Sequence, residues 1–232
     1  RRLQELERQQ ESRAIIEVEG EGDRQYLTGL YMGGNHVLVA LDASASMLAE
    51  SIINVLRRRH MSEERKLASP KWQRALATVS WLTAQIPVES HVQIVTFNTE
   101  LKSVFENDDW VAAIDANRID AAIEDLSEKT PENGTNLLIL FDHIATMDPL
   151  PDNVFLIIDS LPTQSSRAPR KAVVTGQKRF EYFRDAVEEL PQGIPINVIM
   201  FPMEGDPQAS AAYWNLARIT QGTYMSPSRD WP

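Results

Sequence analysis

The sequence contains no cysteine among its 232 residues. This absence excludes disulfide bonds, zinc sites built from thiolates and a cysteine nucleophile, and it leaves the redox compartment open. Basic residues are also scarce, because 23 Lys and Arg stand against 33 Asp and Glu, which gives a net charge of −10. Nucleic-acid binding depends on neutralising phosphates with Lys and Arg. The charge balance therefore argues against a nucleic-acid partner.

Long apolar runs are lacking as well. No run approaches the roughly 20 residues that span a bilayer, and no signal peptide is recognisable. A hydrophobic content of 43% and a charged content of 24% are typical of a soluble globular protein. The first residue is Arg1 rather than Met. We therefore expect a fragment of a longer chain, with room for a membrane anchor upstream of residue 1.

The N-terminal segment differs in composition from the rest of the chain. Residues 1–30 are expected to form a polar helical stalk or linker, the remnant of a coiled coil, and residues 31–232 a folded domain. Residues 1–13 have only Leu3 and Leu6 as large apolar residues. A frayed tail is an equally good interpretation, because sustained heptads are absent. The residues from Ile15 to Val18 can form a short strand before the domain.

A short apolar run, His36 to Leu41, predicts a buried strand of a parallel sheet. It ends in the sequence Asp42-Ala43-Ser44-Ala45-Ser46. One carboxylate and two hydroxyls at alternate positions can direct three oxygens at one point, which suits a hard cation such as Mg²⁺. Ligands of open α/β sheets bind at this end of the strands. The alternative is that Ser44 or Ser46 only caps the next helix.

A second acidic residue ends a second buried strand. Residues 154–158 are all apolar, and Asp159 follows them. Acidic residues at the carboxyl ends of two central strands converge in a parallel sheet. Between the two strands, the loop 131–136 delivers Thr135 to the start of a predicted helix.

The remaining pattern alternates strands with helices. Helices are predicted at 47–59, 71–86, from 108 onward and around 119–126, 137–147, 178–190 and 208–220. Strands are predicted at 92–97, 101–105, 196–201 and 222–225, and loops at 61–70 and 160–177. We expect the helix 47–59 to face inward through Leu48, Ile52, Val55 and Leu56. The alternation predicts an α/β fold that is doubly wound, with a mostly parallel central sheet, one antiparallel edge strand and helices on both faces.

These residues resemble the von Willebrand factor type A (VWA) family over about residues 35–224. The metal-ion-dependent adhesion site of that family consists of D-x-S-x-S after the first strand, a Thr in a later loop and an Asp after the fourth strand. Asp42, Ser44, Ser46, Thr135 and Asp159 match these positions in order and context. The resemblance implies a Rossmann-like VWA fold. It also implies Mg²⁺, or else Mn²⁺ or Ca²⁺, held by the three hydroxyls directly and by the two carboxylates directly or through water.

The sequence departs from the family pattern in three places. Ser160-Leu161-Pro162 follows the second Asp where the family often has Gly, so the resemblance leaves the shape of that loop open. Ala45 stands where Gly is frequent. The segment 47–70 is longer than is usual for the family. Because it lies next to the metal face, it either helps to select a partner or is a neutral surface excursion.

The resemblance implies a metal-dependent protein-interaction module, whose ion binds a Glu or Asp of a partner protein. One alternative is a scaffold or adaptor subunit of an ATPase-linked or membrane-linked assembly with a structural metal. A further alternative is a Mg²⁺-dependent phosphoryl-transfer or hydrolytic enzyme. The sequence lacks a Walker motif, a phosphoaspartyl spacing after Asp42 and a triad context for any His. We therefore predict that the protein is not an enzyme, and we expect a membrane-associated protein of the bacterial cell envelope.

Overall fold

The computed structural model describes residues 17–19, 25–27, 30, 32–106, 109–169 and 173–232. The polar residues 1–13 of the predicted helical stalk lie outside the described residues. Strands β1 (Glu17–Glu19) and β2 (Gln25–Leu27) pair antiparallel as a separate two-stranded sheet. The first of them overlaps the short strand considered at residues 15–18. The domain boundary near residue 31 stays a prediction.

The fold is built on a central sheet that is mostly parallel. Its strands in spatial order are β5 (Leu101–Ser103), β4 (His91–Phe97), β3 (His36–Asp42), β7 (Asn153–Ile158), β8 (Ile196–Met200) and β9 (Tyr224–Met225). The edge strand β5 runs antiparallel to β4, and all the other pairs in this order are parallel. The predicted architecture is thus confirmed. Every residue of β7 and β8 is buried, as continuous apolar runs require in a sheet covered on both faces.

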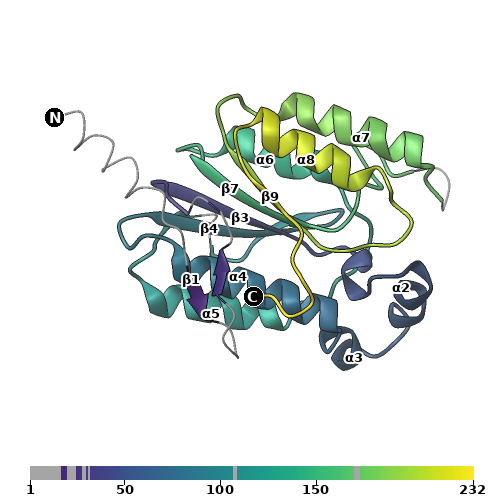
Figure 1. Cartoon of the computed structure of the whole chain (residues 1–232), viewed down its shortest axis with the longest axis horizontal. Helices are drawn as coiled ribbons and strands as arrows, with labels where there is room; N and C mark the ends of the chain where they lie inside the picture. The colour runs from purple at the N-terminus through teal and green to yellow at the C-terminus, as the bar shows by residue number, and fades with distance from the viewer. Residues whose placement is uncertain (1–16, 20–24, 28–29, 31, 107–108, 170–172) are drawn as a thin grey trace.

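Helices cover both faces of this sheet (Figure 1). The helical segments are η1 (Ala45–Leu48), α2 (Ile52–Arg58), α3 (Glu63–Leu67), α4 (Pro70–Gln85), α5 (Ala116–Ser127), α6 (Leu137–Thr146), α7 (Gly176–Glu189) and α8 (Ala209–Ile219). Helices α4 and α5 lie on one face, where Trp72 belongs to the apolar core, and α6, α7 and α8 lie on the other, with Tyr213. Within the described part of the chain, no helix is long and apolar enough to cross a membrane.

The predicted continuous helix at 47–59 is wrong. The chain instead forms the short 3-10 turn η1, breaks at residues 49–51 and starts again as α2. The carbonyl of Ala49 accepts a hydrogen bond from Lys71 Nζ at 3.2 Å, and the carbonyl of Glu50 accepts one from Glu204 N at 2.7 Å. Both carbonyls therefore bond to distant parts of the chain rather than to the N–H groups four residues ahead. As a consequence, Val55 is buried while Ile52 and Leu56 are 48% and 51% exposed.

The predicted loop at 61–70 contains the helix α3. None of the five residues in α3 is buried. The sequence offers no apolar periodicity there, which is the signal that predicts a helix.

The sequence predicts a helix from residue 108 onward. Residues 107–108 lie outside the described residues, and from residue 109 to Asp115 the prediction is wrong, because the described chain is not helical there. Val111 and Ala112 form strand β6, which pairs antiparallel with β4 and adds a second antiparallel strand. The helix α5 begins only after Asp115, whose side chain accepts a hydrogen bond from Arg118 N at 3.3 Å. Such N-terminal capping fixes the helix start.

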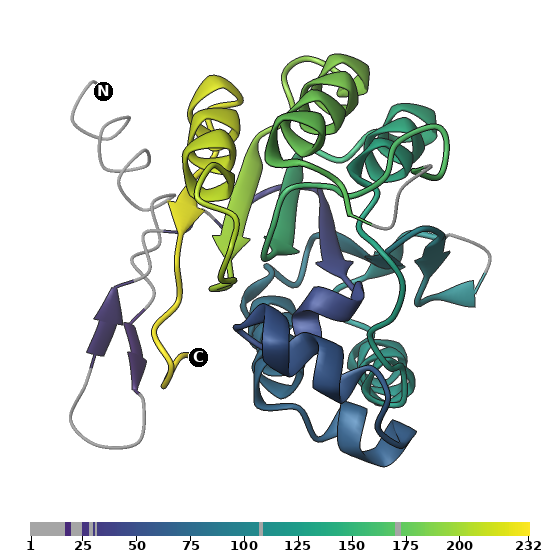
Figure 2. The same cartoon turned by 90° about the vertical axis from the view of Figure 1, so that its right-hand side faces the viewer.

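The order of the strands creates a switch point beside β3. The connection after β3 leads to β4 on one side, whereas β7 lies on the other side. Loops that leave neighbouring strands in opposite directions open a crevice at the carboxyl ends, and ligands bind there in open α/β sheets. Figure 2 views the molecule from this side, with η1, α2 and α3 in front.

Candidate metal centre

Three loops meet at the switch point and bring all five predicted site residues together. Asp42 is the last residue of β3, Asp159 directly follows β7, and Thr135 lies two residues before α6. Main-chain hydrogen bonds fix the loops against each other, because Ala45 N donates to Asn133 O at 3.0 Å. The main chain thus helps to hold the loop after β3 against the loop before α6.

The polar side chains form a connected chain of oxygens. Asp42 Oδ1 accepts a hydrogen bond from Ser44 N at 2.8 Å, and Asp42 Oδ2 accepts one from Thr135 Oγ1 at 3.3 Å. Ser44 Oγ lies 2.9 Å from Ser46 Oγ, which donates to Asp159 Oδ1 at 2.8 Å. The side chain of Ser44 makes no capping bond to η1, although Ser44 precedes that turn. Ser46 lies inside η1 rather than at its N-cap position, so neither serine caps this turn with its side chain.

The two carboxylates of the site are buried next to each other. Asp42 is 0% exposed and Asp159 is 1% exposed. Burial raises the pKa of Asp42 to about 7, and the negative charge of Asp159 adds to this rise, against the hydrogen bonds from Ser44 and Thr135. A cation bound between the two carboxylates would offset both the burial and the repulsion.

The donor set fits a divalent cation. Carboxylate and hydroxyl oxygens are hard ligands of the kind that Mg²⁺ and Ca²⁺ prefer. Ser44, Ser46 and Thr135 would supply neutral oxygens, and Asp42 and Asp159 charged ones. Among the described residues, no group of three or more His, Cys, Asp or Glu side chains offers a second metal site.

Lys71 is a charged residue of the site that the sequence patterns did not identify. Its Nζ lies 2.6 Å from Asp159 Oδ2, and the side chain is only 2% exposed. It comes from the first turn of α4, four residues before Ala75 and eight before Val79, both of which are buried. Residues at this spacing share one helix face, so helical periodicity could have indicated an inward lysine.

The loop after Asp159 is held in place without the glycine that is frequent in the family. Leu161 N donates to Asp206 Oδ2 at 2.7 Å, and Arg179 Nη2 forms an ion pair with the same oxygen at 2.8 Å. The hydroxyl of Tyr213 donates to Ser160 O at 3.1 Å. These contacts anchor the loop to α7, α8 and the segment before α8.

A cavity of about 180 Å³ opens directly onto the site. Ser44, Ser46 and Thr135 line one part of it, and Ile52 and Met203 line another. This volume can take the end of one partner side chain above the oxygens. The cavity thus offers the access that an added ligand of the metal needs.

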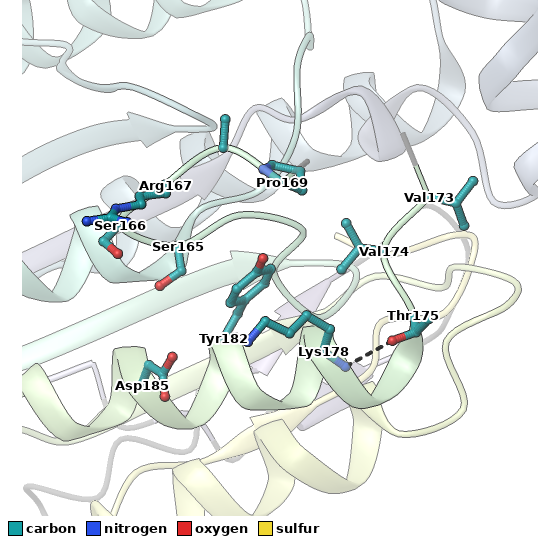
Figure 3. Close-up of a pocket in the computed structure, with 11 residues that line it drawn as sticks. Ser165, Ser166, Arg167, Pro169, Val173, Val174, Thr175, Lys178, Tyr182 and Asp185 are labelled. Carbon is teal, nitrogen blue, oxygen red and sulfur yellow. Dashed lines mark hydrogen bonds between the residues drawn. The ribbon is translucent and has the colours of Figure 1, made fainter. Parts of the chain in front are cut away.

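A larger cavity of about 560 Å³ lies elsewhere, between α7 and the loop before it. In Figure 3, Lys178 and Tyr182 of α7 line it together with Ser165 and Arg167 of the loop. None of the five predicted site residues lines this cavity. We assign the function to the smaller cavity because Ser44, Ser46 and Thr135 line it. Their hydroxyls are linked by hydrogen bonds to the buried carboxylates of Asp42 and Asp159.

Gly134→Ala is expected to weaken metal binding without unfolding the protein. A Cβ at position 134 would collide with Thr163 Oγ1. That oxygen accepts the hydrogen bond of Thr135 N at 3.0 Å, so the collision displaces a residue of the site. We expect isothermal titration calorimetry to show an affinity for Mn²⁺ that is weaker by about tenfold, the lower end of the usual cost of disturbing residues that position metal ligands. Gly176→Ala is the matched control, because nothing lies within 4 Å of its added Cβ. Equal affinities in both variants would contradict the prediction.

No protein-family model and no curated protein sequence matches this chain. Solved structures do match it. A von Willebrand factor type A protein from Catenulispora acidiphila has a TM-score of 0.51 at 13% identity, and the match covers 84% of this chain but only 39% of that one. BatB from Bacteroides thetaiotaomicron has a TM-score of 0.47 at 16% identity, covering 84% of this chain and 91% of that chain.

A third match is proximal thread matrix protein 1 from the mussel byssus, whose own metal-ion-dependent adhesion site holds zinc. Its TM-score is 0.49 at 14% identity, and the match covers 84% of this chain and 44% of that chain. At these identities, similarity concerns the fold alone, and the match to the Catenulispora acidiphila protein carries that conclusion.

Proposed function

Given the von Willebrand factor type A fold of this chain, we propose that it is a metal-dependent protein-interaction module. Asp42, Ser44, Ser46, Thr135 and Asp159 hold Mg²⁺, with Mn²⁺ or Ca²⁺ as substitutes, and the ion binds a Glu or Asp of a partner protein. The main support is that three hydroxyl-bearing residues line an open cavity and are linked by hydrogen bonds to two buried carboxylates. Mg²⁺ usually keeps positions for water or an added ligand.

The surface beside the cavity supports a protein partner. Ile52 lines the cavity, and on the same helix Ile53 is 70% exposed and Leu56 is 51% exposed. Exposed apolar residues next to a polar site are a common feature of protein interfaces. The segment 47–70 therefore contributes to partner selection in this proposal. A membrane anchor upstream of residue 1 and a location in the bacterial envelope stay predictions.

Selection from a random peptide display library tests the acidic partner directly. The protein is immobilised in Mg²⁺, and bound peptides are eluted with a chelator. We expect the recovered peptides to share one Asp or Glu, and its replacement by Asn or Gln to abolish binding. The same selection on Asp42→Asn protein serves as the control. Peptides that bind equally well in chelator, or that share no acidic residue, would contradict the proposal.

A scaffold that needs no metal for its fold is the second candidate. It is favoured by one observation, namely that Lys71 already neutralises Asp159 within the protein. In that case the protein binds its partner equally well with Mg²⁺ and with chelator. We give it the second place because Lys71 contacts only one of the two carboxylates of the site among the contacts described.

A further inference from the structure

The ammonium group of Lys71 occupies a built cation site beside the candidate metal centre. Its Nζ donates to Asp159 Oδ2 at 2.6 Å, to Ser46 O at 3.1 Å and to Ala49 O at 3.2 Å. A lysine ammonium has three N–H donors, so these three oxygens satisfy it completely. The side chains of Lys71 and Asp159 are 2% and 0% exposed. This is a buried charge pair with full hydrogen bonding, which differs physically from a surface ion pair.

The carboxylate of Asp159 faces two different groups with its two oxygens. Oδ2 bonds to Lys71, whereas Oδ1 accepts the hydrogen bond of Ser46 Oγ at 2.8 Å. A metal ion held by Ser46 and Asp159 approaches from the Oδ1 side. Two cations would then share one buried carboxylate, and their repulsion is only weakly screened away from water.

We propose that Lys71 is a resident cation that competes electrostatically with the divalent ion and lowers the affinity of the site for it. The inference rests on the proposed metal site. With the ion bound, the site holds three positive charges, two from the ion and one from Lys71. The carboxylates of Asp42 and Asp159 supply only two negative charges. One positive charge is left unmatched. An acidic group from a partner neutralises it, so Lys71 makes the loaded site favour an anionic ligand.

The direction in which the metal affinity changes when Lys71 is replaced separates this role from a purely structural one. If Lys71 only orients Asp159, its removal loosens the carboxylate and weakens metal binding. If Lys71 competes with the ion, its removal leaves the charge of Asp159 buried without a counter-charge and strengthens metal binding. In the second case the metal also restores stability that the variant loses in chelator, because an unpaired buried charge is destabilising.

The experiment compares Mn²⁺ binding by isothermal titration calorimetry in the wild-type protein and in Lys71→Met, which keeps most of the side-chain length. We expect Lys71→Met to bind Mn²⁺ at least tenfold more tightly than the wild type. Its melting temperature should lie below that of the wild type in chelator and rise by more on addition of Mn²⁺. Lys102→Met is the matched control, because the Lys102 side chain is 64% exposed. Lys71→Gln, which is neutral but still donates hydrogen bonds to Asp159, gives the same test if the Met variant fails to fold.

The outcomes distinguish this inference from the proposed function. If the wild-type protein binds Mn²⁺ and both Lys71 variants bind it equally well or more weakly, the role of Lys71 is overturned and the proposed function stands. Binding by the variants alone supports the role of Lys71 but overturns the metal bridge in the wild-type protein. No binding by any form overturns both.

Discussion

Asp42→Asn is expected to abolish the rise in melting temperature that Mg²⁺ or Mn²⁺ causes in the wild-type protein. A ligand that binds only the folded state stabilises it by about 2.7 kcal/mol at a concentration 100 times its Kd. Asp42 supplies one of the two carboxylates at the site. The side-chain amide of Asn carries no charge, but its oxygen can still accept the hydrogen bond from Ser44 N. The measurement is a thermal melt at increasing metal concentration, with and without chelator.

The control for this variant is Asp120→Asn, which removes the same charge from an exposed position on α5. It should melt and respond to metal as the wild type does. A metal-dependent shift of equal size in Asp42→Asn would show that the ion binds elsewhere. The lack of any shift in the wild-type protein would instead count against the metal site as a whole.

Gly222→Ala is expected to lower the free energy of unfolding by about 3 kcal/mol, near the upper end of the usual cost of overpacking. An added Cβ would collide with the main-chain carbonyl of Ile196 and lie within 2.8 Å of Ile196 N. These atoms belong to the start of β8 and cannot rotate away as a side chain can. Gly222 also caps the last turn of α8, which ends at Ile219, because its N–H donates to Ala217 O at 2.8 Å.

Urea denaturation followed by circular dichroism measures this loss. For a chain of this size each kcal/mol also lowers the melting temperature by about 2–4 °C. Gly176→Ala is again the control, because its added Cβ meets nothing within 4 Å and Ala favours a helix. A Gly222→Ala protein as stable as this control would refute the close approach of the two segments.

The sheet could be predicted because its signals are local. Apolar runs such as residues 154–158 can be buried in few ways, and the alternation with helices restricts the topology. The positions of Asp42 and Asp159 at strand ends then followed from the strands themselves. The resemblance and the composition of its loop assigned Thr135 to the site. In the structure its Oγ1 lies 3.3 Å from Asp42 Oδ2. Whether these residues bind metal stays a prediction.

Two of the errors lie where distant parts of the chain decide the local structure. Residues 47–59 have helical periodicity, yet the carbonyl of Glu50 bonds to Glu204 and the helix is interrupted. Val111 pairs with Val92 of β4, so a strand forms where a helix was predicted. No local pattern contains the hydrogen-bond partners that produce these changes.

Within the candidate site, too, some features follow from local sequence and others from contacts between distant residues. The sequence by itself determined the candidate oxygen ligands Asp42, Ser44, Ser46 and Asp159 and their place at the ends of two parallel strands, because side-chain chemistry and strand burial are properties of short segments. Only the tertiary structure decided that Lys71 enters the site, since its ammonium meets Asp159 across 88 positions of the chain. A buried charge has to find its counter-charge wherever the fold supplies one. That long-range pairing sets the electrostatic balance that a metal ion would meet.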